Sequence, residues 1–321
     1  MRRRKNMKKI IEALNKAEKI AIIPHINADG DAIGSCKAMA EMLNNREKKA
    51  TIYIEEPVEK RLNFISDDIV LFNSDFEKPD TCLVLDCGDK ERTGERSVIL
   101  DSAELVINID HHRTNTMFGD LNLVMPDAAA TGEILALLFD EMKIEYTTEI
   151  AKYLYTAICS DTGRFSYSNV SKQTFLIAAK LVEYNINHAE ISRLLFESKD
   201  LNSELLRAEL TGNIHSFYGG RIRTVSASRA LAKKYNISEE EIQDIVDIPR
   251  RIEGTDIAVG LKEKDGKVRV SLRSNGYADV SVIALNFGGG GHAKAAGCTI
   301  DTHSLEEAEE IVVKACEAVL I

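Results

Sequence analysis

The sequence predicts a two-domain α/β protein: a mostly parallel sheet with helices on both faces, followed by a smaller α/β domain. The chain has 321 residues, and at roughly 150 residues per domain this length suggests two domains. Apolar runs over residues 20–23, 81–85 and 104–109 alternate with amphipathic helical patterns. Strands that alternate with helices are typical of a parallel sheet whose two faces are covered.

In the first domain, hydrophobic periodicity predicts a helix after each of several apolar runs. The expected helices are residues 7–17, 32–43, 130–142, 148–160, 172–184 and 188–196, and the expected strands are 20–24, 51–54, 81–85 and 104–109. The basic residues 1–5 are expected to form a solvated tail, and no clear pattern assigns the polar segment that ends at Asp80.

In the second domain, Asp265-Gly266 between two apolar stretches is a strong signal for a β-hairpin. The expected helices are residues 201–217, 280–287 and 305–320, and the expected strands are 222–226, 256–261, 268–273 and one around 298–300. Ser238 with the glutamates at 239–241 matches a capping box. We therefore expect a domain over residues 1–186, a helical connector over 187–219 and a second domain over 220–321.

The composition is that of a soluble globular protein, with 44% hydrophobic and 29% charged residues. A net charge of -10 argues against a long nucleic-acid groove, which usually needs a basic stripe. This net charge does not exclude a small phosphate ligand that is bound by metals and a few local arginines. No apolar run approaches the roughly 18 residues of a membrane helix, and no secretory signal follows the basic start. The six cysteines form no CxxC pair, so we expect a cytoplasmic protein without a membrane partner.

Acidic and imidazole side chains follow four of the predicted apolar elements. They are His25, Asp29 and Asp31 after the first strand, Asp86 after the third, Asp110, His111 and His112 after the fourth, and Asp161 at the end of a helix. Carboxylates in a strand-to-helix turn are favoured by the helix dipole. Ligands of a parallel sheet bind beyond the carboxyl ends of its strands, so we expect the four groups to converge at that edge.

Carboxylate and imidazole groups this close together are unfavourable unless a cation lies among them. An oxygen-rich set with a few imidazoles suits Mn²⁺ or Mg²⁺, and the absence of thiolates argues against structural zinc. More acids than one ion needs suggest two ions about 3.5–4 Å apart, a pair suited to phosphoryl chemistry. Such a pair would lower the pKa of a bridging water, so that no side-chain nucleophile is required. The alternative is an ordinary capped turn with a polar histidine.

A run of glycines near the end of the chain precedes a histidine. The run comprises Gly288, Gly289, Gly290 and Gly291, and His292 follows it. Glycines let backbone N–H groups approach an anion closely, and a helix N-terminus directly after the run would add its dipole. His292 and Arg273 could then bind a terminal phosphate, with Arg273 as a two-pronged donor. The alternative is a flexible loop with an ordinary histidine.

These motifs resemble those of the DHH phosphoesterase superfamily, the RecJ-like group. The matching residues are His25-x₃-Asp29-x-Asp31, Asp86, Asp110-His111-His112 and Asp161. Residues 288–297 resemble the glycine–histidine motif of the associated DHHA1 domain, with Arg273-Ser274 upstream. The matches run from residue 22 to residue 297. The length resembles that of the nano-RNase branch, whose members act on short oligonucleotides and on 3′-phosphoadenosine 5′-phosphate.

The resemblance implies a role for each matched residue, although spacing alone does not separate His111 from His112. His25 and Asp29 would hold one ion, Asp31, His111 and Asp161 would hold the other, and Asp86 would bridge both. Asp110 would orient an imidazole, and His112 would face the substrate phosphate and aid protonation of the leaving group. The implied substrate-binding residues are Arg273, Ser274, Gly289, Gly290, Gly291, His292 and Arg113. Arg113 and Arg164 either neutralise substrate phosphates or are solvated surface charge. Thr131-Gly132-Glu133 also matches the family, without a physical role that the sequence reveals.

We therefore expect an enzyme that uses two divalent ions, with Mn²⁺ favoured over Mg²⁺ or Co²⁺. It would degrade RNA oligomers of a few residues to mononucleotides or remove phosphate from a nucleoside bisphosphate, and it would have no long nucleic acid as partner. Hydrolysis of cyclic dinucleotides such as c-di-AMP, or of linear dinucleotides, is the alternative. Cleavage of inorganic pyrophosphate and a catalytically silent nucleotide-binding protein are weaker alternatives. The sequence leaves a homodimer open.

Overall fold

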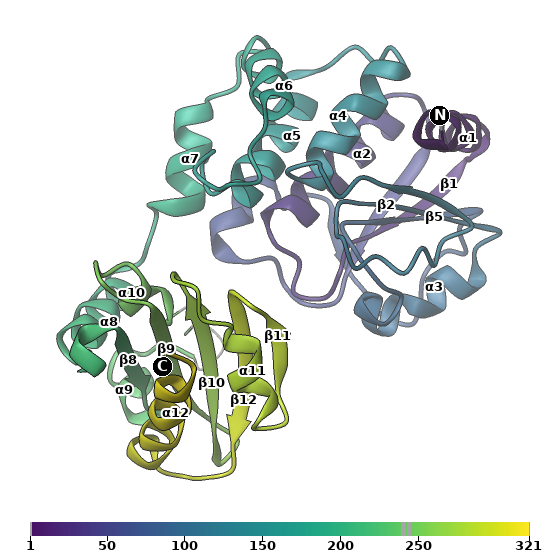
Figure 1. The fold of residues 1–321 in the computed structure, drawn as a ribbon. Helices are drawn as coiled ribbons and strands as arrows, with labels where there is room; N and C mark the ends of the chain where they lie inside the picture. The colour runs from purple at the N-terminus through teal and green to yellow at the C-terminus, as the bar shows by residue number, and fades with distance from the viewer. Residues whose placement is uncertain (1, 239–241, 243–244, 321) are drawn as a thin grey trace. The chain divides into compact units, whose positions relative to one another are not determined.

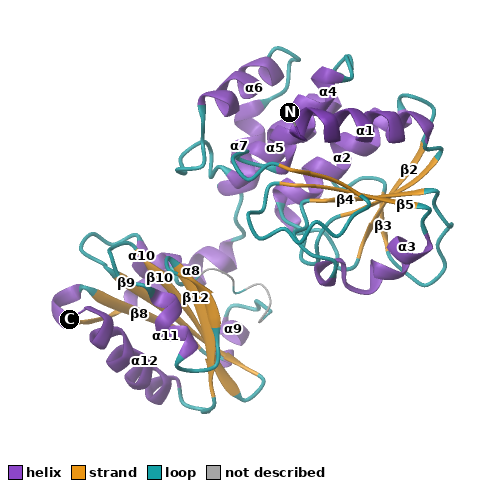
Figure 2. Ribbon diagram, turned by 45° about the vertical axis from the view of Figure 1, so that its right-hand side comes forward, coloured by secondary structure: helices purple, strands orange, loops and turns teal. Residues whose placement is uncertain are grey.

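The computed structural model describes residues 2–238, 242 and 245–320. The chain divides into two compact units, Met1–Ser198 and Lys199–Ile321 (Figure 1). Each unit contains one sheet with helices packed against it (Figure 2). None of the helices within the described residues is both long enough and apolar enough to cross a bilayer.

Unit 1 contains a six-stranded sheet in the order β3-β2-β1-β4-β5-β6, in which every neighbouring pair is parallel. The strands are β1 (Lys19–Ile23), β2 (Lys49–Ile54), β3 (Ile69–Leu71), β4 (Thr81–Leu85), β5 (Leu105–Asp110) and β6 (Leu121–Val124). The strand order reverses between β1 and β4. In open parallel sheets the crevice for a ligand lies at such a switch point, beyond the carboxyl ends of the strands.

Helices cover both faces of this sheet, which is why its central strands read as continuous apolar runs. The helices of unit 1 are α1 (Arg2–Lys16), α2 (Gly30–Asn44), α3 (Ser97–Ser102), α4 (Thr131–Glu141), α5 (Thr148–Asp161), α6 (Lys172–Val182) and α7 (His188–Phe196), with short 3₁₀ helices η1 (Lys60–Ile65) and η2 (Glu91–Arg96). Ile20 and Ile22 of β1 pack into the large core with α1, α2, α4 and α5. Ala21 and Ile23 pack into a smaller core with Ile99 of α3.

Small residues allow α2, α4 and α5 to pack at close range. A Cβ on Gly34 of α2 would lie 2.7 Å from the Tyr153 carbonyl oxygen of α5. A Cβ on Gly132 of α4 would lie 2.5 Å from the Cβ of Ala157. Both distances are shorter than the non-bonded contacts that Cβ atoms make in proteins, so only glycine fits at these two positions. This packing brings Asp31 on α2 and Asp161 on α5 to the same edge of the sheet.

Unit 2 contains a mixed sheet in the order β11-β12-β10-β9-β8-β7, in which only β8 and β9 run parallel among the described strands. The elements are α8 (Leu201–Gly212), β7 (His215–Phe217), η3 (Tyr218–Gly220), β8 (Ile222–Ala227), α9 (Arg229–Lys234), α10 (Asp247–Arg250), β9 (Ile257–Lys264), β10 (Lys267–Ser274), α11 (Val280–Leu285), β11 (Gly290–His292), β12 (Ala295–Ile300) and α12 (Leu305–Leu320). Val268, Val270 and Leu272 of β10 pack in one core with Val312 of α12. The predicted hairpin turn at Asp265-Gly266 is confirmed, with both residues in the left-handed region.

The structure corrects two predictions about local structure and adds two short strands in segments that the sequence left unassigned. Residues 2–5 belong to α1 rather than to a tail, because Arg and Lys are good helix formers and no breaker separates them from the apolar face. The predicted helix 201–217 ends at Gly212, and His215–Phe217 pairs with β8 instead. The polar segment before Asp80 and the segment after His112 contain the short strands β3 and β6, which carried too little periodicity to predict. The predicted capping box after Ser238 lies outside the described residues.

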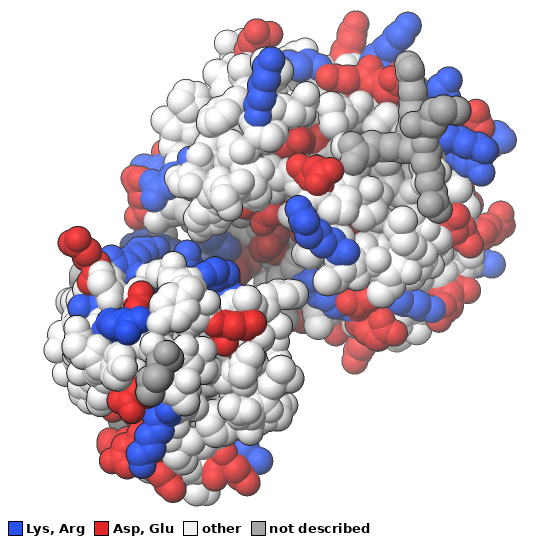
Figure 3. All heavy atoms as spheres, in the orientation of Figure 1, with Lys and Arg blue, Asp and Glu red and all other residues white. Residues whose placement is uncertain are grey.

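On the face of the molecule drawn in Figure 3, acidic and basic side chains lie side by side over unit 1, and basic side chains gather at one end of unit 2.

All six cysteines are buried free thiols, as expected for small core residues.

Replacing Gly34 by Ala should destabilise unit 1 by about 1–3 kcal/mol, because the added methyl forces α2 away from α5. Urea denaturation measured by circular dichroism tests this. Gly212→Ala in α8 is the matched control, since a Cβ there meets no atom within 4 Å. The control should leave stability unchanged or raise it by about 0.4–1 kcal/mol. Equal losses in both variants would contradict close packing as the cause.

Candidate metal centre

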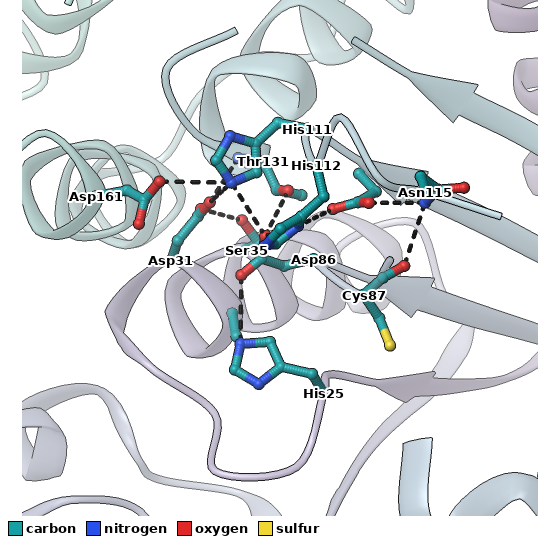
Figure 4. A network of polar contacts seen from close by, with 12 residues as sticks. His25, Asp31, Ser35, Asp86, Cys87, His111, His112, Asn115, Thr131 and Asp161 are labelled. Carbon is teal, nitrogen blue, oxygen red and sulfur yellow. Dashed lines mark hydrogen bonds and ion pairs between the residues drawn. The ribbon is translucent and has the colours of Figure 1, made fainter. Parts of the chain in front are cut away.

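The four groups of acidic and histidine residues found in the sequence converge at the carboxyl edge of the unit 1 sheet, beside the switch point between β1 and β4. Figure 4 shows His25, Asp31, Asp86, His111 and Asp161 directed toward a common centre. Asp31, Asp86 and Asp110 are almost fully buried. Three residue groups bring one ligand atom each to within 4.8 Å of one another. They are His25/Asp29/Asp86, Asp31/His111/Asp161 and Asp86/His111/His112.

The turn between β1 and α2, together with the first residues of α2, supplies three of these side chains, His25, Asp29 and Asp31. Asp29 is the N-cap of α2, and its Oδ1 accepts from the backbone N–H groups of Asp31 at 3.0 Å and Ala32 at 3.1 Å. This is a capping pattern that favours helix formation. The Nδ1 of His25 lies 2.6 Å from the carbonyl oxygen of Ile26. A carbonyl only accepts, so Nδ1 carries the proton and the lone pair of Nε2 is free to bind a cation.

Asp86 lies between two of the groups. It directly follows β4 with a φ of 56°, a left-handed conformation that aspartate tolerates better than most residues. Its Oδ2 lies 3.6 Å from Nε2 of His25. Its Oδ1 lies 3.5 Å from Nε2 of His111. The two oxygens of one carboxylate therefore face two different histidines.

The second group surrounds His111. Its Nε2 lies 3.4 Å from Oδ2 of Asp161 and 3.9 Å from Oδ2 of Asp31. Two ligand atoms that are each about 2.1 Å from one ion, at tetrahedral or octahedral angles, lie about 3.0–3.5 Å apart. The distances from Nε2 of His111 to Asp161 and Asp86, 3.4 and 3.5 Å, fall within that range. The distance from Nε2 of His25 to Asp86, 3.6 Å, lies just above it. The donor set of carboxylates and imidazoles thus fits divalent cations such as Mn²⁺ or Mg²⁺.

The electrostatics of the centre indicate that it lacks positive charge. Burial is the largest cause that raises the pKa of Asp31 well above its ordinary range, and the charges of Asp86 and Asp161 raise it further. Burial likewise raises the pKa of Asp29, and that of Asp161 to about 7. For Asp86, burial alone would raise the pKa, but the imidazoles of His25 and His111 outweigh burial and lower it. A bound cation would remove this strain because it stabilises every ionised carboxylate.

Asp31 is held by residues whose role the sequence did not reveal. Its Oδ1 accepts from the Gly132 N–H at 2.9 Å and the Ser35 hydroxyl at 3.0 Å. Its Oδ2 accepts from the Thr131 N–H at 2.6 Å. An oxygen with two donors has no lone pair left, so only Oδ2 can bind a cation. The spacing of four residues between Asp31 and Ser35 on one helix was the available signal for Ser35.

Thr131 connects Asp31 to Asp86. While its backbone N–H donates to Asp31, its hydroxyl donates to Oδ1 of Asp86 at 3.0 Å. The motif Thr131-Gly132-Glu133, to which the sequence assigned no role, is therefore the N-terminal turn of α4 that fixes two carboxylates. Glu133 holds the same region together, since its Oε2 accepts from the Thr174 hydroxyl at 2.8 Å.

Asp110 and His112 form a pair beside these groups. Asp110 is fully buried, and its Oδ1 accepts from Nδ1 of His112 at 2.7 Å. This hydrogen bond is the largest cause that raises the pKa of His112 to about 9, with burial opposing it. The remaining ring nitrogen of the half-buried His112 is Nε2, which Asp110 leaves free.

The residues predicted to bind substrate in unit 2 lie at one end of its sheet. Arg273 on β10 and His292 on β11 both pair with Ala295 on β12, so all three project from the same face. Ser274 is one residue further and lies on the opposite face, buried, with its hydroxyl donating to the Gly276 carbonyl oxygen at 3.4 Å.

The glycine run lies against β12. A Cβ on Gly289 would lie 2.2 Å from the Gly297 carbonyl oxygen, so glycine permits this close approach, whereas Gly290 meets open space. Gly291 has a φ of 141°. The helix N-terminus expected after the run is wrong: the run follows the C-terminus of α11, and β11 and β12 come next. Gly289 and Gly291 are therefore the two glycines of the run that approach β12 too closely for a Cβ.

The two arginines beside the acidic groups differ in their surroundings. Arg113 is exposed. Arg164 forms an ion pair with Glu197, and its guanidinium lies 4.9 Å from the centre of the Phe196 ring. Arg164 is thus held at the end of α7.

Comparison with known proteins gives two domain matches and several full-length relatives. Residues 19–158 match the DHH family, N-terminal domain, and residues 224–319 match the DHHA1 domain. The chain is 33% identical to the bifunctional oligoribonuclease and PAP phosphatase NrnA of Thermus thermophilus, over 96% of this chain and 93% of that protein. It is 24% identical to the cyclic-di-AMP phosphodiesterase PdeA of Listeria monocytogenes, over 96% of this chain but 48% of that longer protein. A solved exopolyphosphatase-related protein of Bacteroides fragilis has the same fold, with a TM-score of 0.91 at 24% identity and coverage of 98% of this chain and 96% of that one.

Thr131→Val should weaken Mn²⁺ binding about 10- to 100-fold, because groups that orient metal ligands typically contribute this much. The variant keeps the backbone donor to Asp31 and removes only the hydroxyl that donates to Asp86. Isothermal titration with Mn²⁺ measures the change. Thr131→Ser, which retains the hydroxyl, is the matched control and should bind Mn²⁺ nearly as well as the wild type. Unchanged binding by the valine variant would contradict a role for the hydroxyl.

In the metal-free protein, His112 should titrate near pH 9 rather than near pH 6.5. A raised pKa of a histidine means that the protonated ring stabilises the fold. That contribution is complete below pH 6.5 and is lost as the pH rises through 9. Histidine NMR chemical shifts followed against pH measure the midpoint, and Asp110→Asn should lower it. A midpoint near 6.5 in the wild type would contradict the observed pairing.

Proposed function

Because the chain belongs to the DHH phosphoesterase family, we propose that it is a two-metal hydrolase acting on very short nucleotide substrates. It degrades RNA oligonucleotides of a few residues to mononucleotides and removes phosphate from a nucleoside bisphosphate such as 3′-phosphoadenosine 5′-phosphate. One observation carries the two-metal part: the oxygens of Asp86 face His25 on one side and His111 on the other. The name of the Thermus relative, an oligoribonuclease and PAP phosphatase, supports the substrate class.

The proposed ligands divide into two sets that share one carboxylate. His25 and Asp29 would hold the first cation, Asp31, His111 and Asp161 would hold the second, and Asp86 would be shared by both. Mn²⁺ is the favoured ion, with Mg²⁺ or Co²⁺ as substitutes, because the set is rich in oxygen and contains no thiolate. When bound, two such ions polarise a phosphoryl group and activate water.

The remaining residues of unit 1 act on the substrate. With Nδ1 held by Asp110 at 2.7 Å, His112 offers Nε2 to the phosphoryl oxygens or the leaving group. A proton held there is available to the departing oxygen, and general acids of this kind contribute typically 10²–10⁴-fold. Arg113 is exposed and contributes positive charge for the substrate phosphates.

Unit 2 supplies the residues that recognise the substrate end. Arg273 and His292 project from one face of its sheet on either side of the small Ala295. An arginine fork and an imidazole suit a terminal phosphate. The backbone of Gly289, Gly290 and Gly291 lies beside them, and Ser274 supports the strand end from the opposite face. Free thiols are consistent with action in the cytoplasm.

A phosphodiesterase acting on cyclic dinucleotides, or on the linear dinucleotides derived from them, is the second candidate. The Listeria relative is named a cyclic-di-AMP phosphodiesterase, and this chain spans about half of that protein. The same ligands serve both reactions, so the difference lies in substrate binding.

A turnover comparison with Mn²⁺ should rank the substrates. We expect a linear RNA dinucleotide and 3′-phosphoadenosine 5′-phosphate to be hydrolysed at least about tenfold faster, as kcat/KM, than c-di-AMP or a 20-residue RNA; a tenfold ratio corresponds to about 1.4 kcal/mol. Product analysis by chromatography measures this. Fastest hydrolysis of c-di-AMP would favour the second candidate, and fastest degradation of the long RNA would contradict both.

The control for this experiment is Asp86→Asn, which keeps the shape of the side chain and removes its charge. Turnover of every substrate should fall below detection, and calorimetry should reveal weaker Mn²⁺ binding. Full activity of this variant would exclude Asp86 as a shared ligand, whichever substrate is preferred.

A further inference from the structure

We propose that Asn115 is a positioning residue for this reaction: its amide fixes the Asp110 carboxylate in the orientation that directs Nε2 of His112 toward the substrate. The inference rests on the proposed function and extends it to a residue outside the sequence motifs. Asn115 lies in the loop between β5 and β6, three residues after His112. Figure 4 shows its amide directed toward Cys87 and toward the carboxylate beside His112.

The Asp110 carboxylate is held at both oxygens. Its Oδ1 accepts from Nδ1 of His112 at 2.7 Å, and its Oδ2 accepts from Nδ2 of Asn115 at 2.7 Å. Asp110 has no exposure to solvent that could replace a lost donor. The torsion that turns a carboxylate about its last bond is broad in energy. A second donor on Oδ2 therefore determines where Oδ1, and with it the imidazole ring, points.

Asn115 is itself fixed by its surroundings. Its Nδ2 lies 2.8 Å from Oδ1 of Asn108, and its Oδ1 accepts from the Met117 N–H at 2.7 Å. These contacts determine which end of the amide is the donor, since a backbone N–H can only donate to the oxygen. The fully buried Asn108 is fixed in turn, because its Nδ2 donates to the carbonyl oxygens of Val84 and Cys87 at 3.2 and 3.1 Å. A continuous chain of hydrogen bonds thus connects the backbone of β4 to His112.

An ordinary turn role explains only half of these contacts. The bond from the Met117 N–H to Oδ1 of Asn115 is a common way for asparagine to stabilise a turn. That role does not require the Nδ2 group to lie against a buried carboxylate. The placement of Nδ2 between Asp110 and Asn108 is specific to the pair that carries His112.

The test uses Asn115→Asp in the full-length, Mn²⁺-loaded protein with a linear RNA dinucleotide as substrate. The variant keeps the shape and the acceptor for Met117 but replaces the donor to Asp110 by a second carboxylate. We expect kcat to fall about 10- to 100-fold. KM and the Kd for Mn²⁺ should stay within about twofold of the wild type, because the proposed cation ligands and the residues of unit 2 that bind the substrate end are unchanged. Asn115→Ser, whose hydroxyl is too short to reach Asp110, should give the same split if the aspartate variant folds poorly.

A double variant supplies the rescue. Asp110→Asn together with Asn115→Asp exchanges the amide and the carboxylate, so a donor and an acceptor again face each other. Its kcat should exceed that of either single variant, because the two positions are coupled. A double variant no better than the poorer single variant would overturn the inference.

Asn122→Asp is the matched control. Asn122 lies in β6, directly after the loop that contains Asn115. Its Nδ2 donates to the Gly119 carbonyl oxygen at 2.6 Å and its Oδ1 accepts from the Gly119 N–H at 3.1 Å. This variant is expected to retain the wild-type kcat. An equal loss of kcat in Asn122→Asp would mean that any disturbance of the segment impairs the reaction, which would overturn a specific role for Asn115.

An NMR measurement on the metal-free protein separates this inference from the proposed function. A ring N–H that donates to a carboxylate at 2.7 Å gives a strongly downfield proton signal, here the Nδ1–H of His112. The signal should be present in the wild type and in Asn122→Asp and lost or broadened in Asn115→Asp. If the wild type hydrolyses none of the substrates, the proposed function fails while this result still decides what Asn115 does. An unchanged signal in Asn115→Asp would overturn the inference.

Discussion

Mutual repulsion among buried and half-buried carboxylates is the constraint on which the rest of unit 1 depends. Asp29, Asp31, Asp86 and Asp161 meet at one edge of a sheet, and burial with neighbouring charge raises the pKa of three of them. A fold tolerates such a concentration of acids only if something else stabilises them. Part of that stabilisation comes from the protein itself, through the N-terminal turn of α4 and the imidazoles around Asp86. Bound divalent cations would supply the remaining stabilisation, because such ions are often the largest local charges in a site.

The geometry of the centre is determined by backbone packing more than by side-chain flexibility. Gly34 and Gly132 allow α2, α4 and α5 to approach one another, and the N-terminal turn of α4 then donates directly to Asp31. Asp86 directly follows β4, and its own left-handed backbone conformation sets the direction of its side chain. Rigid elements therefore hold the ligands, and such support is what keeps a catalytic constellation within a few tenths of an ångström of its productive geometry.

The sequence predicted the parallel sheet, both domains and the convergence of the four acidic and histidine groups, because strand ends in a parallel sheet must share an edge. It could not predict the residues that support them. Thr131 acts through hydrogen bonds to residues far away in the sequence, and Asn115 acts through a contact within a loop. Neither contact leaves a periodic signal, and only Ser35 has one, because it lies one helical turn after Asp31. The prediction of a helix after the glycine run was wrong for a related reason. Gly289 permits a close approach of the chain to Gly297 of β12, and local sequence does not encode this contact. The basic start of α1 has the charge typical of a solvated tail, but its residues favour a helix. It is helical because it continues a helix whose residues Ile10 and Leu14 are buried.

The chain divides its chemistry between two units. Every carboxylate and imidazole of the three candidate cation groups belongs to unit 1. The arginine and histidine that flank Ala295 belong to unit 2. If unit 2 binds the substrate end as proposed, changes there would alter substrate choice and leave the candidate cation ligands of unit 1 in place. This separation gives a physical reason why relatives that share the domain are named for different substrates, an oligoribonucleotide in one case and cyclic di-AMP in another. Under the proposed function, the reaction would depend on the charges gathered in unit 1, and the choice of nucleotide would depend on Arg273 and His292 of unit 2.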